Sequence, residues 1–212
     1  MNLSMAVELS YLLSSVLFVI GLKRLQSPAT ARGGNQLAAL AMLIAIVATL
    51  LDNQIADWTT IIVAMTVGTI IGGFAARMVQ MTEMPELVGI FNGFGGAASA
   101  LVAAAELIRL QSLGASSPVG EGLSIVLSCL IGTVTFSGSF IAFGKLKGLV
   151  SGNPITFPLQ KTLNAVLFLG ILVFGGAIMG LFQIGNLTAL NTFYIFTAAA
   201  IALGILLVIP IG

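Results

Sequence analysis

The chain contains no histidine and a single cysteine, Cys129, among its 212 residues. One cysteine cannot form a disulfide framework, and without histidine there is neither a Cys–His nucleophile pair nor a zinc-ligand pattern. The formal net charge is +1, so no basic excess indicates nucleic-acid binding. These absences exclude disulfide-stabilised, zinc-dependent and nucleic-acid-binding proteins.

Charged residues are also scarce. They make up 7% of the chain, against 58% for hydrophobic residues, whereas a soluble domain has roughly 25% charged residues. This composition excludes a soluble enzyme and predicts an integral membrane protein in contact with a lipid bilayer. Apolar stretches long enough to cross a bilayer as helices are separated by short polar joints. We predict an all-α bundle of about seven transmembrane helices, near residues 5–22, 37–51, 58–76, 86–108, 122–143, 162–182 and 189–209.

The lysines and arginines predict the orientation of these helices. If the N-terminus is outside, only Arg109 faces outward, and the cytoplasmic side holds Lys23, Arg24, Arg32, Arg77, Lys145, Lys147 and Lys161. Because short loops rich in Lys and Arg stay in the cytoplasm, we predict an outside N-terminus and a cytoplasmic C-terminus. The longest cytoplasmic connection, residues 145–161, is either a plain linker or a docking surface for a soluble partner through Lys145, Lys147 and Lys161.

The stretch from Met81 to Glu106 has the most informative pattern. Carboxylates stand at Glu83 and Glu86, on either side of Pro85, and the residues from there to Glu106 carry no charge. Small residues recur every three or four positions, a pattern that lets membrane helices pack closely. We expect this seam to comprise Gly89, Asn92 or Gly93, Gly96, Ser99 or Ala100, and Ala103. Asn92 either bonds a neighbouring helix or lies on an ion or water path.

Two further patterns bear on the site. The run Gly93-x-Gly95-x-x-Ala98 has neither the preceding strand nor the following acidic residue of a dinucleotide fingerprint, so we predict no cofactor on this chain. The helix over 122–143 carries hydroxyl residues, of which Thr135 and Ser139 share one face. These hydroxyls either bond carbonyls of their own helix or meet the Asn92 seam and line a hydrated path.

Four segments resemble, in order, the membrane domain of the beta subunit of proton-translocating NAD(P) transhydrogenase. The most distinctive reads Met-Thr-Glu-Met-Pro-Glu-Leu-Val, and the four segments are Tyr11–Leu22, Ser27–Asn35, Met81–Val88 and Gly132–Leu146. The resemblance implies a subunit of an enzyme that transfers hydride between NADH and NADP+ on soluble domains and couples it to proton movement. It also implies alpha-subunit partners, a dimer of the whole enzyme and a bacterial inner-membrane location, with NAD(H) and NADP(H) bound in the complete enzyme.

The resemblance also assigns site residues. Many members have a proton-carrying histidine at the position of Asn92, which as an amide cannot hold a proton. We therefore expect Asn92 to be a channel position, and the titrating group to be Glu86 or a histidine of the companion subunit. The expected proton path comprises Glu86, Asn92, Ser99, Thr135 and Ser139, within one transmembrane proton-channel domain over residues 1–212.

Beta subunits of this family continue through two more spans and an NADP-binding domain, so we expect this chain to be a fragment without hydride chemistry of its own.

Two alternatives to the transhydrogenase interpretation stay open. The first alternative is an independent small transporter or channel that uses the helix face of Glu86 and Asn92. The second is an assembly subunit whose glycine seam serves only packing, in which case changes at Glu86 and Asn92 would alter transport little.

Overall fold

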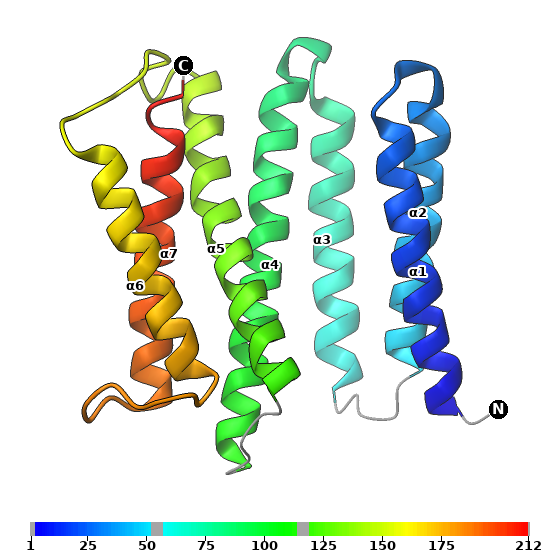
Figure 1. Ribbon diagram of the computed structural model, residues 1–212. Helices are drawn as coiled ribbons and strands as arrows, with labels where there is room; N and C mark the ends of the chain where they lie inside the picture. The colour runs from blue at the N-terminus through cyan, green and yellow to red at the C-terminus, as the bar shows by residue number, and fades with distance from the viewer. Residues whose placement is uncertain (1–2, 52–56, 114–118, 212) are drawn as a thin grey trace. The chain divides into compact units, whose positions relative to one another are not determined.

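The structure is a computed structural model that describes residues 3–51, 57–113 and 119–211 (Figure 1). Within these ranges the chain is helical, and seven helices are long and apolar enough to cross a membrane. They are α1 (Leu3–Leu25), α2 (Pro28–Leu50), α3 (Trp58–Met78), α4 (Met84–Ser112), α5 (Val119–Leu146), α6 (Gln160–Ile178) and α7 (Ala189–Val208); a short 3-10 helix, η1 (Met81–Glu83), precedes α4. The prediction of seven apolar helices is confirmed, while their orientation stays a prediction.

The chain divides into two compact units, residues 1–71 and 72–212. In the first unit, α1 and α2 form a helical hairpin. Gly21 and Gly34 allow their close contact, because a Cβ on Gly34 would lie 2.8 Å from the Gly21 carbonyl oxygen. The buried Ser14 hydroxyl donates a 2.7 Å hydrogen bond to the carbonyl oxygen of Ala41. Close backbone contact and an interhelical hydrogen bond are what stabilise paired helices in lipid.

Helix α2 begins well before the predicted residue 37. Ser27 is its N-cap residue and Pro28 occupies the first turn, where the missing N–H of proline costs no hydrogen bond. Hydropathy alone placed the start too late because Arg32, Asn35 and Gln36 interrupt the apolar run. Those polar residues lie within the helix, at its N-terminal end.

In the second unit, α5 packs against both α4 and α7, and α6 packs against α7 (Figure 1). The hydrophobic core lies where these helices meet and includes the fully buried Cys129, Ile171 and Phe196. Helix α6 ends at Ile178, earlier than the predicted residue 182, because Gly180 adopts a left-handed conformation with φ of 75°. Its amide donates to the Ala177 carbonyl, and the chain turns away from the helix axis.

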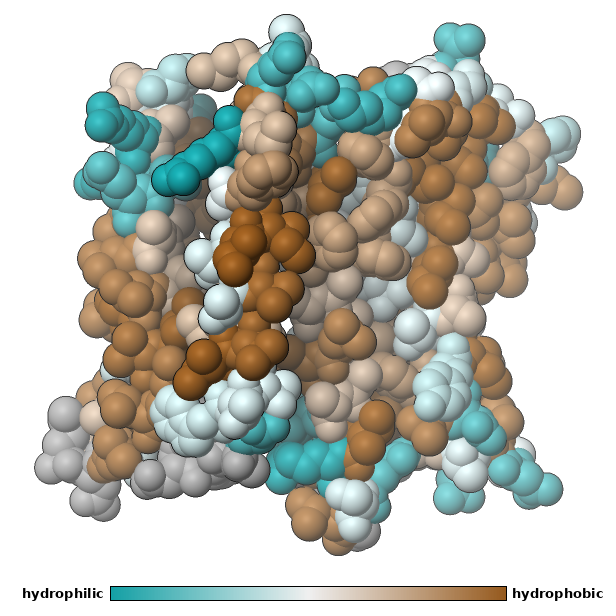
Figure 2. Space-filling view, turned by 180° about the vertical axis from the view of Figure 1, so that it is seen from behind, coloured by the Kyte–Doolittle hydropathy of each residue, from teal (hydrophilic) through white to brown (hydrophobic). Residues whose placement is uncertain are grey.

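The exposed surface of the helices is apolar. Figure 2 shows hydrophobic residues over the middle of the helices and hydrophilic residues at their ends. Side chains such as Leu12, Phe74 and Val102 are each more than 60% exposed. An exposed apolar surface of this kind is the surface that a lipid bilayer covers.

Candidate functional site

Glycines bring α4 and α5 into backbone contact. A Cβ on Gly96 would lie 2.5 Å from the Gly132 carbonyl oxygen, and a Cβ on Gly132 would lie 2.5 Å from the Gly96 carbonyl oxygen. One turn along α4, a Cβ on Gly93 would lie 2.9 Å from a ring carbon of Phe140. The predicted glycine seam of α4 therefore faces α5, and any side chain at Gly96 would force the two helices apart.

Polar side chains of the two helices meet along this glycine contact. Asn92 Nδ2 donates a 2.8 Å hydrogen bond to Ser139 Oγ, and Ser99 Oγ donates a 3.3 Å hydrogen bond to the Ser128 carbonyl oxygen. The Thr135 Cβ would lie 2.9 Å from a Cβ on Gly96. The α4–α5 interface thus brings together Asn92, Ser99, Thr135 and Ser139, four of the residues that the sequence predicted to act together.

Two other hydroxyl side chains of α5, those of Ser137 and Thr133, point away from α4. Ser137 donates a 3.1 Å hydrogen bond to the Thr133 carbonyl oxygen of its own helix, and its Oγ would contact a Cβ on Gly204 of α7. Thr133 Oγ1 lies 3.7 Å from the sulfur of buried Cys129. Ser137 therefore bonds its own backbone, whereas Ser139 contacts Asn92 of α4; a hydrated path along this face stays a prediction.

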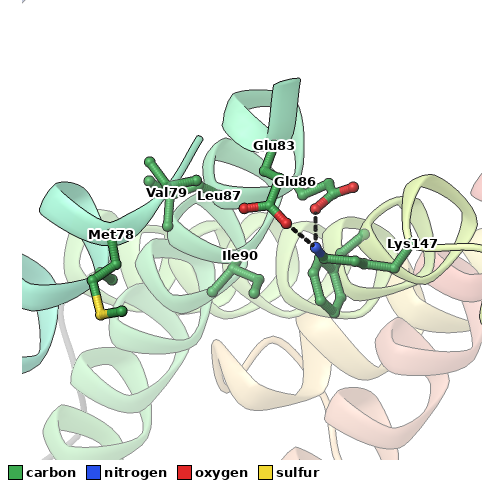
Figure 3. A pocket seen from close by; sticks show the side chains of 9 residues that line it. Met78, Val79, Glu83, Glu86, Leu87, Ile90 and Lys147 are labelled. Atoms are coloured by element: carbon green, nitrogen blue, oxygen red, sulfur yellow. Dashed lines mark hydrogen bonds and ion pairs between the residues drawn. The ribbon is translucent and has the colours of Figure 1, made fainter. Parts of the chain in front are cut away.

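An ion-pair cluster lies at the end of the second unit where α4 begins and α5 ends. Lys147 Nζ lies 2.5 Å from Glu86 Oε2 and 2.9 Å from Glu83 Oε1 (Figure 3). We call these three residues the Lys147 cluster. The ammonium's hydrogen bonds to Glu86 and then to Glu83 raise the pKa of Lys147 above its ordinary value of 10.5. Lys147 is therefore charged at every physiological pH.

The Lys147 cluster lines a cavity of about 270 Å³. Apart from the cluster its walls are apolar, and its lining residues are Ala75, Met78, Val79, Glu83, Glu86, Leu87, Ile90, Phe143 and Lys147. Phe143 also lies next to Gly89, where an added Cβ would be 3.7 Å from the Phe143 Cβ. The cavity is thus lined by residues of both α4 and α5 at the end of their contact where α4 begins, and Asn92 follows Gly89 by about one helical turn.

The backbone around the cluster explains its geometry. After Leu146, Gly148 takes a left-handed conformation with φ of 72°, and the amides of Leu149 and Val150 donate to the Gly144 carbonyl oxygen at 2.8 and 2.9 Å. This C-terminal cap turns the chain at Lys147. On the α4 side, Glu83 Oε2 accepts a 3.5 Å hydrogen bond from the Gln80 amide.

The opposite ends of α4 and α5 carry a second bridge. Arg109 Nη2 lies 2.5 Å from Glu106 Oε1 on the same helix and 3.8 Å from Glu121 Oε1 on α5. A cation between two carboxylates therefore links the two helices at each end of their contact. Sequence reasoning missed both bridges, although the predicted topology places Glu86 with Lys147, and Arg109 with Glu121, on common sides of the membrane.

The lysines predicted to dock a partner have different surroundings. Lys145 Nζ donates a 2.7 Å hydrogen bond to the Ile209 carbonyl oxygen and also bonds the Ile211 carbonyl oxygen. A cation at these carbonyls complements the negative C-terminal end of α7. Lys161 is exposed in the first turn of α6. Thus Lys145 and Lys147 both make contacts within the chain, and docking through the three lysines stays a prediction.

The sequence comparisons identify the family. A family model described as the NAD(P) transhydrogenase beta subunit matches residues 7–212. The chain belongs to this family. The relationship expected from the Met81–Val88 segment and its three companions is therefore confirmed.

Individual relatives agree with this assignment. The chain is 39% identical over 207 residues to the NAD(P) transhydrogenase subunit beta of Rhodospirillum rubrum, and a second sequence of that species matches equally well. The match covers 96% of this chain and 43% of the relative. The chain thus spans less than half the length of the relatives it matches, in a region where it forms apolar helices.

Proposed function

We propose that this chain is the proton-conducting membrane part of NAD(P) transhydrogenase. In the complete enzyme, hydride transfer between NADH and NADP+ takes place on soluble domains and is coupled to proton movement through these helices. The observation that carries the proposal is the hydrogen bond between Asn92 and Ser139, two polar side chains on facing apolar helices. Polar side chains on membrane-spanning helices are costly and are often found on ion and proton paths.

The chemistry of each residue limits its role. The Asn92 amide donates and accepts hydrogen bonds but does not titrate, so it orients water or the neighbouring hydroxyl. Glu86 is the ionisable residue on the cavity wall nearest this pair along α4. We assign the proton path to Glu86, Asn92, Ser99, Thr135 and Ser139, with the titrating group either Glu86 or a histidine of the alpha subunit.

We also propose the membrane, the orientation and the partners of the chain. The membrane is the inner membrane of a bacterium, with the N-terminus outside and the C-terminus in the cytoplasm. The partners are the alpha subunit and an NADP-binding domain, and the whole enzyme is a dimer that binds NAD(H) and NADP(H). The bias of basic residues and the family of the chain support these assignments.

The test uses the complete enzyme in inverted membrane vesicles. NADPH and an NAD+ analogue are added, and analogue reduction and internal pH are followed together. We expect a nucleotide-dependent pH change that Asn92→Leu reduces by about tenfold or more, because a water-orienting group is lost. The matched control is Asn191→Leu, at an exposed position in the first turn of α7. The absence of any nucleotide-dependent pH change in an intact wild-type complex would refute the proposal.

A further inference from the structure

We propose that Lys147 is a positioning residue that holds the Glu86 carboxylate, as its counter-ion, on the wall of the cavity beside the α4–α5 interface. This inference rests on the proposed function, in which Glu86 belongs to the proton path. Lys147 itself would not carry the proton. Its role is to pair with the Glu86 carboxylate and thereby to fix the pH dependence of the coupled reaction.

The burial of Glu86 is the first argument. The Glu86 side chain is 17% exposed, whereas those of Lys147 and Glu83 are 38% and 41% exposed. Glu86 Oε2 is shielded from solvent and, within the described chain, has no other polar partner than the Lys147 ammonium 2.5 Å away. A buried carboxylate oxygen without a cation is strongly disfavoured. Lys147 therefore supplies the counter-charge that a carboxylate needs at this position.

The second argument is the pairing of two carboxylates around one cation. Glu83 and Glu86 both lie within 3 Å of the same nitrogen, so the cluster carries one negative charge in excess. Among the residues that the structure describes, no other ionisable residue lines this cavity: the contributions from α3 and its C-terminal flank are Ala75, Met78 and Val79, and α5 contributes Phe143. Without Lys147, two carboxylates would lie at the edge of an open, mainly apolar pocket with no cation between them. Repulsion between like charges then favours protonation of one of them.

The backbone position of Lys147 does not depend on its charge. The left-handed Gly148 and the two amides that donate to the Gly144 carbonyl oxygen fix the turn. Methionine has a similar unbranched side chain, so Lys147→Met should retain this backbone and remove only the ammonium. Lys147→Arg keeps a cation at the same turn. This pair of variants separates the charge of Lys147 from its packing.

The experiment measures coupled hydride transfer against pH, from pH 5 to 9, in vesicles that hold the complete enzyme. We expect Lys147→Met to move the midpoint of the profile upward by about one pH unit or more, because a stabilising cation is lost beside a second carboxylate. The Lys147→Arg enzyme should have the same midpoint as the wild type, because it keeps a cation at this position. In the double variant Lys147→Met with Glu83→Gln, the midpoint should return toward the wild-type value because the repulsion is removed. Lys23→Met, at the exposed end of α1, is the matched control.

Two results would overturn the inference. One is an unchanged midpoint in an active Lys147→Met enzyme. The other is that Lys147→Met loses activity equally at every pH and that Lys147→Arg loses it as well. That result would indicate a purely structural role of Lys147. If Lys147→Met does not assemble, Lys147→Gln is measured with the same criteria. The same measurements separate this inference from the proposed function. If Asn92→Leu retains the coupling, the proton path is refuted. If Asn92→Leu loses the coupling but Lys147→Met has the wild-type midpoint, only the role of Lys147 is refuted.

Discussion

Gly96 of α4 and Gly132 of α5 face each other so closely that a Cβ on either would lie 2.5 Å from the carbonyl oxygen of the other. This contact sets the spacing of the whole α4–α5 interface. One helical turn away from it, Asn92 Nδ2 reaches Ser139 Oγ at 2.8 Å. The glycine contact and the polar pair therefore depend on each other: a wider helix separation would break the hydrogen bond.

The first prediction concerns this glycine contact. Gly96→Ala should destabilise the folded protein by about 1–3 kcal/mol, the usual cost of overpacking a close contact. Gly95→Ala is the matched control on the same helix, since a Cβ there has nothing within 4 Å. The measurement is thermal unfolding of the purified protein in detergent. Equal melting temperatures for the two variants would contradict the observed interface.

The second prediction concerns the coupling between Asn92 and Ser139. Ser139→Ala should reduce proton-coupled hydride transfer because the Asn92 amide loses its partner. If the two side chains act as one unit, the double variant with Asn92→Leu should be little worse than Asn92→Leu alone. Rates of all four proteins are compared in vesicles. Effects that multiply in the double variant would show that the two residues act independently.

The third prediction concerns how much the Lys147 cluster stabilises the folded protein at alkaline pH. Its carboxylate partners, Glu86 first, raise the pKa of Lys147 above 10.5. A raised folded-state pKa means that the stabilisation is fully present below the unfolded value and is lost only as the pH rises through the raised value. The difference in melting temperature between wild type and Lys147→Met should therefore be constant from pH 7 to about 10 and shrink above it. A difference that disappears near neutral pH would contradict the cluster.

The fourth prediction concerns orientation. Cys129 is the sole cysteine and is fully buried, so Cys129→Ala gives a background without reactive thiols. A cysteine placed at Ser151, exposed in the connection between α5 and α6, should react with a membrane-impermeant maleimide only from the cytoplasmic side. A cysteine placed at Leu113, exposed at the far end of α4, should react only from outside. The reverse labelling pattern would overturn the predicted topology.

The sequence predicts the helices well because lipid imposes a simple requirement of long apolar segments. The sequence does not predict those helix ends that local backbone geometry determines. Pro28 starts α2 ahead of the apolar run, and the left-handed Gly180 stops the continuation of α6 although apolar residues such as Leu181 and Phe182 follow. Hydropathy does not register either effect.

The candidate site was also predictable from the sequence only in part. Residues that share a helix face follow from the 3.6-residue repeat, which is why Thr135 and Ser139 could be placed together from sequence. The partner across the interface does not follow from any repeat. Lys147 bonds Glu83, which lies 64 residues earlier, and only the fold brings them together. The sequence therefore suggested a docking role for Lys147, whereas the structure places its ammonium on two carboxylates of the same chain.

A proton path through Asn92 and Ser139, coupled to hydride transfer, can be tested directly. The most direct measurement imposes a pH gradient across vesicles that hold the complete enzyme and records the rate of NADPH formation. The account predicts that the gradient accelerates the wild-type enzyme and the Asn191→Leu control, but leaves Asn92→Leu unaffected. If the gradient accelerates Asn92→Leu as much as wild type, protons do not pass Asn92 and the account is wrong.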